Sequence, residues 1–225
     1  MDISIDFGIT VTDLIKRDKG VLSHQMTLSK EEPSSSLLKQ LLPDIDFKYD
    51  VNFLAVTGGK HLYLGDEIES TKIIHVNEID AVGEGAMNLS GLNNKNPTII
   101  VSAGSGTACI LARDGQFMHC SGTGVGGGTV LGLSKLLLGT TNPDEIAKLA
   151  KEGSESGVDL ILEDVVSGPI GELPSDTTAV NFGKISKLDS EVSKQDIAAG
   201  IVNLVGQTAA RIATSVATTF NAKEI

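Results

Sequence analysis

The stretch SGTGVGGGTVLGLSKLL, Ser121–Leu137, is the most informative part of the sequence. It places five glycines within the seven positions from Gly122 to Gly128, directly before an apolar run. Glycine lets a backbone approach a phosphate closely, and a helix N-terminus offers unpaired N–H donors and a partial positive charge. The stretch therefore predicts an anion-binding turn that opens a helix over 129–138. It lacks the lysine of a Walker-type loop and is not the first strand-turn unit, where a Rossmann fingerprint would lie.

Two further glycine turns lie upstream. They are DFGITVTD, Asp6–Asp13, and SAGSGTA, Ser102–Ala108, and each joins two strand-like stretches. Taken alone, each turn fits a plain hairpin as well as it fits an anion-binding nest of backbone N–H groups. One such turn opens each half of the chain, and the third precedes a helix. Together they predict a phosphotransferase with two similar lobes, each of which supplies a loop for the phosphates of ATP.

The hydrophobic pattern predicts an α/β chain in which the second half repeats the opening of the first: strand, glycine turn, strand, hairpin, strand. Strands are predicted over 1–7, 10–16, 21–28, 53–57, 73–76, 98–102, 107–112 and 116–120. Helices are predicted over 34–42, 78–89, 129–138, 144–151 and 196–220. The polar, turn-rich stretch 93–97 is the predicted boundary between an N-terminal lobe, residues 1–95, and a C-terminal lobe, residues 96–225.

Composition excludes several classes of function. The 18 basic and 29 acidic residues give a formal net charge of −11, which would repel a nucleic acid. The two cysteines, Cys109 and Cys120, indicate reduced thiols rather than a disulfide framework or a metal site. No basic leader followed by a long apolar run opens the chain, and no apolar run is long enough to span a membrane. We therefore expect a cytoplasmic protein that contacts neither membrane nor nucleic acid.

At this point the sequence resembles a known family, the type II pantothenate kinases. The resemblance rests on Ser121–Leu137, on SAGSGTA, and on three further segments. These are TGGK at 57–60, NEIDAVGEG at 77–85 and GELPSDTTAVNFGK at 171–184. The resemblance implies the two-lobed, actin-like (ribonuclease H-like) kinase fold of the sugar kinase, heat-shock ATPase and actin superfamily, with mixed sheets flanked by helices. It also implies ATP-dependent phosphorylation of pantothenate, the first step of coenzyme A biosynthesis.

The resemblance assigns roles to individual residues. Glu78 corresponds to the general base that deprotonates the substrate hydroxyl. Without the resemblance, Glu78 would be interpreted as a solvated acid at the start of a helix. Asp6 corresponds to an aspartate that the family's pattern associates with Mg²⁺ through water, as a hard cation prefers. The positions that correspond to substrate-binding residues are His119, Ala108 and Ser121. The ATP and phosphate loops correspond to Gly8, Thr10, Ser105, Gly106, Thr107, Gly126, Gly127 and Gly128.

Four positions depart from the family pattern. Ile9 replaces the second of two adjacent glycines, and Asp13 stands where a lysine is usual. His119 and Ala108 replace an arginine and a serine that bind the pantothenate carboxylate, and a neutral histidine lacks the bidentate fork of arginine. Three alternatives therefore stay open: a neutral acceptor such as pantetheine, a sugar or amino sugar, and a regulator that binds nucleotide or coenzyme A derivatives without catalysis.

The last predicted helix, 196–220, carries an apolar stripe interrupted by small residues. The resemblance implies a homodimer formed through helices of this region, whereas the pattern alone fits an ordinary buried helix equally well. Residues 221–225 have the pattern of a strand that is about to begin. We therefore expect the chain to be cut short, with the family's adenine-side segment following.

Overall fold

The computed structural model describes residues 1–92, 96–167, 170–187 and 192–225. The chain separates into two compact units, Met1–Ile100 with Ile110–His119, and Val101–Cys109 with Cys120–Ile225. The strands β7 (Thr98–Ala103), β8 (Thr107–Arg113) and β9 (Gln116–Thr123) form one sheet in that order, and both units contribute residues to it. The predicted lobe boundary at 95/96 falls at residues 93–95, which lie outside the described ranges, and it stays a prediction.

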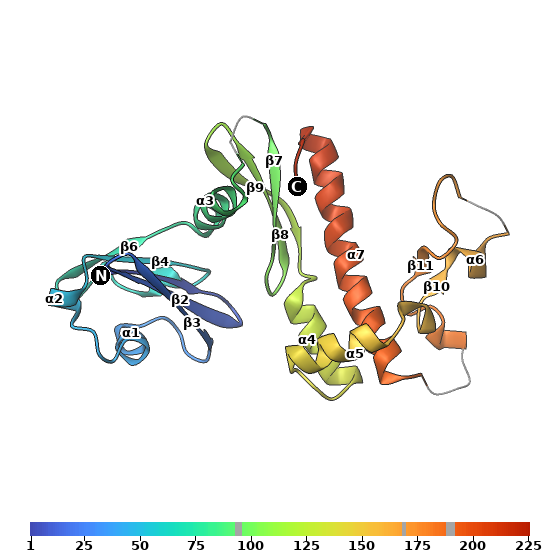
Figure 1. Cartoon of the computed structure of the whole chain (residues 1–225), viewed down its shortest axis with the longest axis horizontal. Coiled ribbons are helices and arrows are strands. Elements are labelled where there is room, and N and C mark those ends of the chain that lie inside the picture. The colour runs from blue at the N-terminus through green and yellow to red at the C-terminus, as the bar shows by residue number, and fades with distance from the viewer. Residues whose placement is uncertain (93–95, 168–169, 188–191) are drawn as a thin grey trace. The chain divides into compact units, whose positions relative to one another are not determined.

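The first unit contains a six-stranded mixed sheet in the order β3-β2-β1-β4-β6-β5 (Figure 1). Its strands are β1 (Asp2–Phe7), β2 (Val11–Asp18), β3 (Val21–Leu28), β4 (Phe53–Thr57), β5 (Glu67–Ile68) and β6 (Thr71–His75). β1 pairs antiparallel with β2 but parallel with β4, and β4 is parallel with β6. The carboxyl ends of β1, β4 and β6 therefore meet at one edge of the sheet, which is where open α/β sheets bind ligands.

Alternation along β1 creates the core of this unit. Ile3, Ile5 and Phe7 are buried, while the residues between them belong to the opposite face. The short helices α1 (Ser35–Leu41) and α2 (Phe47–Asp50) contribute Leu38, Leu42 and Phe47 to the same cluster. The opposite face carries Asp6, which is therefore available to a site.

A second cluster of the same unit forms around α3 (Glu78–Ser90). Met87 of α3 packs with Ile100, Ile110 and Ala112 of the three-stranded sheet. A methyl group on Gly83 would overlap the ring of Phe117 on β9, so only glycine allows this approach. The packing fixes the helix that begins at Glu78.

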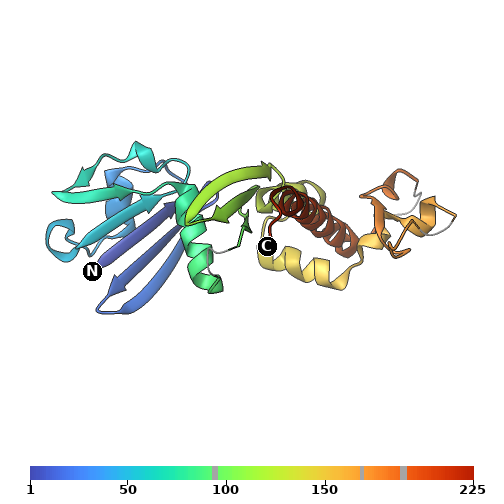
Figure 2. The ribbon, with the colours of Figure 1, turned by 90° about the horizontal axis from the view of Figure 1, so that it is seen from above.

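The second unit is mainly helical. α5 (Pro143–Glu152) lies alongside the long helix α7 (Lys194–Phe220), as Figures 1 and 2 show, and α4 (Gly127–Leu137) also contacts α7. Leu138, Ala198 and Ile201 form its buried centre. Smaller elements complete the chain: η1 (His61–Tyr63) in the first unit, and η2 (Glu155–Gly157), β10 (Leu160–Ile161), α6 (Leu162–Val165), β11 (Thr178–Val180) and η3 (Ile185–Lys187) in the second.

The predicted elements agree with the observed ones apart from their ends. Ser34 and Asn142 cap α1 and α5 through their side chains, as their positions in the sequence predict. α4 begins at Gly127 rather than Thr129, because two of the glycines adopt helical backbone angles. The short pair β10 and β11 was not predicted, since two or three residues leave no periodic pattern. In the described part of the chain, no helix is both long and apolar enough to cross a membrane.

Candidate functional site

Asp6 lies in a row of three polar side chains on one face of the first sheet. It pairs with Asp13 on β2 and with Thr57 on β4. Its Oδ1 atom is buried and has no hydrogen-bond partner among the described residues, and the same holds for Oγ1 of Thr57. Gly58 follows with φ of +95°, and a Cβ there would stand 2.6 Å from Asp6 Oδ1. Gly58 therefore keeps the space beside the carboxylate open.

The electrostatics link Asp6 to Glu78. Burial raises the pKa of Asp6, and the negative charges of Glu78 and Asp13 raise it further. A buried carboxylate oxygen without a partner, close to other acids, suits a hard cation. In the part of the chain that the structure describes, no three His, Cys, Asp or Glu side chains are grouped to hold a metal. A cation at Asp6 would therefore take its other ligands from water and phosphate, as Mg²⁺ commonly does.

Glu78 is the first residue of α3. Asn77 caps the helix, because its Oδ1 accepts a hydrogen bond from the Ile79 N–H at 2.8 Å. Glu78 is exposed, and it closely follows the carboxyl end of β6. The fold thus brings a solvent-facing carboxylate to the edge of the sheet that also carries Asp6, which is what a general base for a bound hydroxyl requires.

Ser29, which no sequence motif marks, braces the turn that contains Gly8 and Thr10. Ser29 Oγ donates to the Gly8 carbonyl at 2.7 Å, and the Ser29 N–H donates to the Thr10 carbonyl at 3.0 Å. Thr12 Oγ1 lies 2.9 Å from Ser29 Oγ and donates to it, since the serine hydrogen is already used. Ser29 comes directly after β3, so only the hairpin geometry brings it to this turn.

The second and third glycine loops pack backbone against backbone within the second unit. The Gly127 N–H donates to the Gly104 carbonyl at 2.8 Å, and the Gly128 N–H donates to the Ser105 carbonyl at 2.9 Å. A Cβ on Gly126 would stand 2.6 Å from the carbonyl carbon of Gly106. The expectation of free N–H donors is therefore not met at Gly127 and Gly128. The glycines there allow two loops to meet closely, while their contact with phosphate stays a prediction.

Thr107 supports the same contact. It is buried, and its Oγ1 donates to the Val125 carbonyl at 2.8 Å. Its hydroxyl hydrogen is thus committed to the protein backbone, so any phosphate contact by Thr107 would use another atom. Ser105 and Gly106 lie in the turn between β7 and β8 and are partly buried.

The three predicted substrate residues lie on the three-stranded sheet. Ala108 belongs to β8, and His119 and Ser121 belong to β9. His119 and Ser121 are two positions apart, so alternation places them on one face of that strand. His119 is exposed, and Ser121 is partly buried. Their contact with a substrate stays a prediction.

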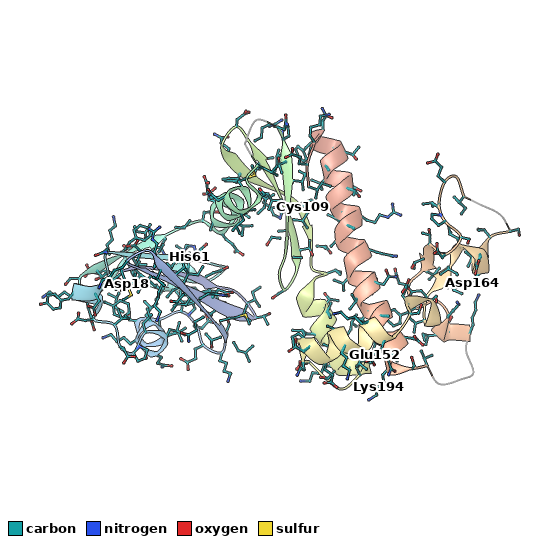
Figure 3. The ribbon with its side chains drawn as sticks, viewed as in Figure 1. Asp18, His61, Cys109, Glu152, Asp164 and Lys194 are labelled. Carbon is teal, nitrogen blue, oxygen red and sulfur yellow. The ribbon has the colours of Figure 1, made fainter. Side chains whose placement is uncertain are left out.

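A buried carboxylate in the second unit was missed by the sequence analysis. Asp159 is fully buried and accepts hydrogen bonds from the Phe182 N–H at 2.7 Å and from Asn203 Nδ2 at 2.9 Å. Asn181 Nδ2 also donates to it, at 3.2 Å. Nearby, Lys184 pairs with Asp164, which Figure 3 labels, at 3.2 Å. The sequence signal for Asp159 was that an acid stands within the apolar run 157–162. Through its hydrogen bonds, Asp159 joins residues 178–184 to α7.

Comparison with known proteins identifies the family. A family model described as Fumble matches residues 87–225. A type II pantothenate kinase of Bacillus anthracis is 30% identical over 226 residues, which cover 99% of this chain and 80% of that protein. The chain belongs to the type II pantothenate kinase family. Another type II pantothenate kinase, from Oceanobacillus iheyensis, is 29% identical over 92% of this chain and 75% of its own length.

Solved structures confirm the predicted fold class of this type II pantothenate kinase family member. The activator of the 2-hydroxyisocaproyl-CoA dehydratase from Clostridium difficile, with bound ADPNP, matches with a TM-score of 0.58 at 14% identity, over 96% of this chain and 75% of that chain. A putative 2-dehydro-3-deoxygalactonokinase protein from Sinorhizobium meliloti matches with a TM-score of 0.52 at 8% identity, over 96% and 81% of the two chains. At these identities the likeness concerns the fold alone, which is the α/β, actin-like class.

One departure from the pattern of the type II pantothenate kinases gains a structural explanation. Asp13 lies directly opposite Asp6 in the sheet, and its Oδ1 is 2.7 Å from His24 Nε2. An acid where a lysine is usual therefore adds negative charge beside Asp6, which raises the pKa of Asp6. A cation bound beside Asp6 would offset this negative charge.

Proposed function

We propose that this protein is an ATP-dependent pantothenate kinase, which catalyses the first step of coenzyme A biosynthesis. Membership of the type II pantothenate kinase family supports the reaction. The observation that carries the proposal is the unpaired, buried carboxylate oxygen of Asp6 within electrostatic reach of Glu78. A metal-associated acid and a solvent-facing acid at one sheet edge are the two carboxylates that phosphoryl transfer to a hydroxyl needs.

In the proposed reaction, the Glu78 carboxylate accepts the proton of the substrate hydroxyl. The hydroxyl oxygen forms a bond to the γ-phosphorus of ATP as the bond between that phosphorus and the β,γ-bridging oxygen breaks, and ADP leaves. Mg²⁺, associated with Asp6 through water, would neutralise charge on the phosphates. The loops at Gly8–Thr10, Ser105–Thr107 and Gly126–Gly128 are assigned to the nucleotide, and His119, Ala108 and Ser121 to the acceptor. In this proposal the N-terminal lobe, residues 1–95, supplies the first phosphate loop and Glu78. The C-terminal lobe, residues 96–225, supplies the second phosphate loop and the glycine-rich loop.

A neutral acceptor is the second candidate. His119 and Ala108 stand where the family pattern has an arginine and a serine for the pantothenate carboxylate, so pantetheine would lose less binding than pantothenate. We also propose that the protein is cytoplasmic and that it forms a homodimer through the region of α7. A sedimentation experiment that reports only monomer at micromolar concentration would contradict the dimer.

The test is a steady-state assay with ATP and Mg²⁺ on pantothenate, pantetheine and an amino sugar. We expect turnover on pantothenate, and Glu78→Gln should lower kcat by about 10²–10⁴-fold because the amide cannot accept the proton. Glu84→Gln, an exposed glutamate on the same helix, is the matched control and should keep the activity. Binding of ATP without transfer to any acceptor would instead favour a regulator.

A further inference from the structure

A histidine pair links two loops at the carboxyl edge of the first sheet. His61 opens η1, just after the turn that follows β4, and His75 ends β6, shortly before Glu78. Their Nδ1 atoms are 3.1 Å apart, and their ring centroids are 5.3 Å apart. Figure 3 labels His61 in this unit, beside the strands of its sheet. Neither histidine lies in a segment that carries the family resemblance.

The hydrogen bonds determine which nitrogen of each ring carries a proton in the neutral pair. His75 Nε2 lies 3.3 Å from the Gly65 carbonyl, which only accepts, so Nε2 is the donor. In a neutral imidazole, His75 Nδ1 is then an acceptor, and the hydrogen between the rings belongs to His61 Nδ1. His61 is therefore held as the Nδ1–H tautomer. Burial and the neighbouring His75 keep the pKa of His61 below its usual value, which favours the neutral form.

His61 of this pair also interacts electrostatically with Glu78, the candidate general base. The charge of Glu78 acts on His61 in the direction that raises the pKa of His61, against the effect of burial. The charge of Glu78 thus acts on His61, although the two residues follow different strands. Because His75 precedes the first turn of α3 so closely, the bond between the rings joins the turn beside Asp6 to the backbone that leads into Glu78.

We propose that the hydrogen bond from His61 Nδ1 to His75 Nδ1 positions Glu78 for proton transfer, so that both histidines are positioning residues. The inference rests on the proposed function, in which Glu78 is the general base. Loss of the bond frees the loop after β4 from the end of β6 and lets the Glu78 carboxylate move away from the hydroxyl. Small displacements of a reacting group are costly in rate, so the effect falls on kcat rather than on the KM for ATP.

The experiment compares four variants in the kinase assay. His61→Ala should lower kcat by about tenfold, and His75→Ala should lower it to a similar degree. The double variant should be no worse than either single one, since both remove the same bond. His61→Asn should restore most of the activity, because the asparagine amide offers an N–H donor at the place of Nδ1. Leu62→Ala, an exposed residue on the same short turn, is the control and should resemble the wild type.

Two results would overturn the inference: a His61→Ala enzyme as active as Leu62→Ala, or a His61→Asn enzyme no better than His61→Ala when both melt at the wild-type temperature. A wild-type protein without kinase activity would contradict the proposed function instead. Nitrogen NMR of the histidine rings then tests whether His61 Nδ1 is protonated and responds to Glu78. A protonated Nδ1 on His61 whose signal moves in Glu78→Gln supports the inference, and a signal that ignores Glu78→Gln overturns it.

Discussion

Asp6 stands between Asp13 and Thr57 in a row across the first sheet, and its buried Oδ1 lacks a partner among the described residues. Its pKa is raised, first by burial and then by the charges of Glu78 and Asp13, so folding disfavours the charged form. Such a group destabilises the fold at neutral pH. Its retention fits a residue selected for chemistry rather than for stability.

Asp6→Asn should therefore stabilise the protein in magnesium-free buffer while it lowers kinase activity. We expect a melting temperature higher by a few degrees, since one kcal/mol corresponds to about 2–4 °C for a chain of this size. Asp2→Asn is the matched control on the same strand and face. Arg17 pairs with Asp2 at 2.7 Å and holds the pKa of Asp2 below its usual value, so this change should lower the stability. A lower melting temperature for Asp6→Asn would contradict the argument.

At the scale of elements, the start of α4 and the β7–β8 turn depend on each other. The N–H groups of Gly127 and Gly128 donate to carbonyls of that turn, and Gly126 lies against Gly106. The glycine run is therefore a packing requirement of the second unit as well as a candidate phosphate loop. This double role explains why so many glycines stand together.

Gly126→Ala should destabilise the protein by about 1–3 kcal/mol, because its Cβ would meet the Gly106 backbone and one loop would have to move. Gly132→Ala, inside the helix that Gly126 precedes as its N-cap, is the control. No atom lies within 4 Å of a Cβ at Gly132, so alanine should stabilise the helix by about 0.5–1 kcal/mol. Denaturant unfolding measures both changes, and equal midpoints for the two variants would refute the packing argument.

A second prediction at this scale concerns the junction between α5 and α7. Asp196 in the first turn of α7 accepts a hydrogen bond from the Ser154 N–H at 2.8 Å. This bond, together with one to Ser193, lowers the pKa of Asp196. A lowered pKa in the folded state contributes stability above the unfolded value, near 3.8, and the contribution is lost as the pH falls through the folded value.

Asp196→Ala should accordingly cost about 1–2 kcal/mol at pH 7. The difference from the wild type should shrink as the pH is lowered below about 4, where the carboxylate becomes protonated first in the unfolded chain and, at lower pH, in the folded protein. Asp196→Asn keeps an oxygen acceptor for the Ser154 N–H and should lose less. A difference from the wild type that stays constant down to pH 2 would show that the carboxylate charge plays no part.

At the scale of the whole molecule, nucleotide binding and stability are linked, because a ligand that binds only the folded chain stabilises it. ATP with Mg²⁺ at about 100 times its Kd should add about 2.7 kcal/mol of stability, which corresponds to a rise in melting temperature of about 5–10 °C. Gly126→Ala should reduce the rise, and Glu78→Gln should leave it intact, because Glu78 is assigned to the acceptor hydroxyl. The absence of a rise with millimolar ATP would contradict the nucleotide site.

Much of the fold could be predicted from local signals. The alternation of Ile3, Ile5 and Phe7 identified the first strand, and Ser34 and Asn142 marked helix starts. By contrast, Ser29 carried no local signal, and the acid within the apolar run 157–162 did not show which groups Asp159 would bind. Each residue acts through hydrogen bonds to residues distant in the sequence. Phosphate binding by the glycines of 126–128 stays a prediction, and the partners of the Gly127 and Gly128 N–H groups could not be predicted from the sequence.

The sequence by itself determined the family and the order of strands and glycine turns, because these depend on residue type and spacing along the chain. It also proposed Asp6 and, through the family resemblance alone, Glu78 as candidates. The tertiary structure decided which of them act together. Only the parallel pairing of β1, β4 and β6 brings their carboxyl ends to one edge, where the charge of Glu78 acts on Asp6 and His61 lies beside His75. The physical reason is that electrostatic and hydrogen-bond interactions depend on distance in space, which residue order alone does not specify.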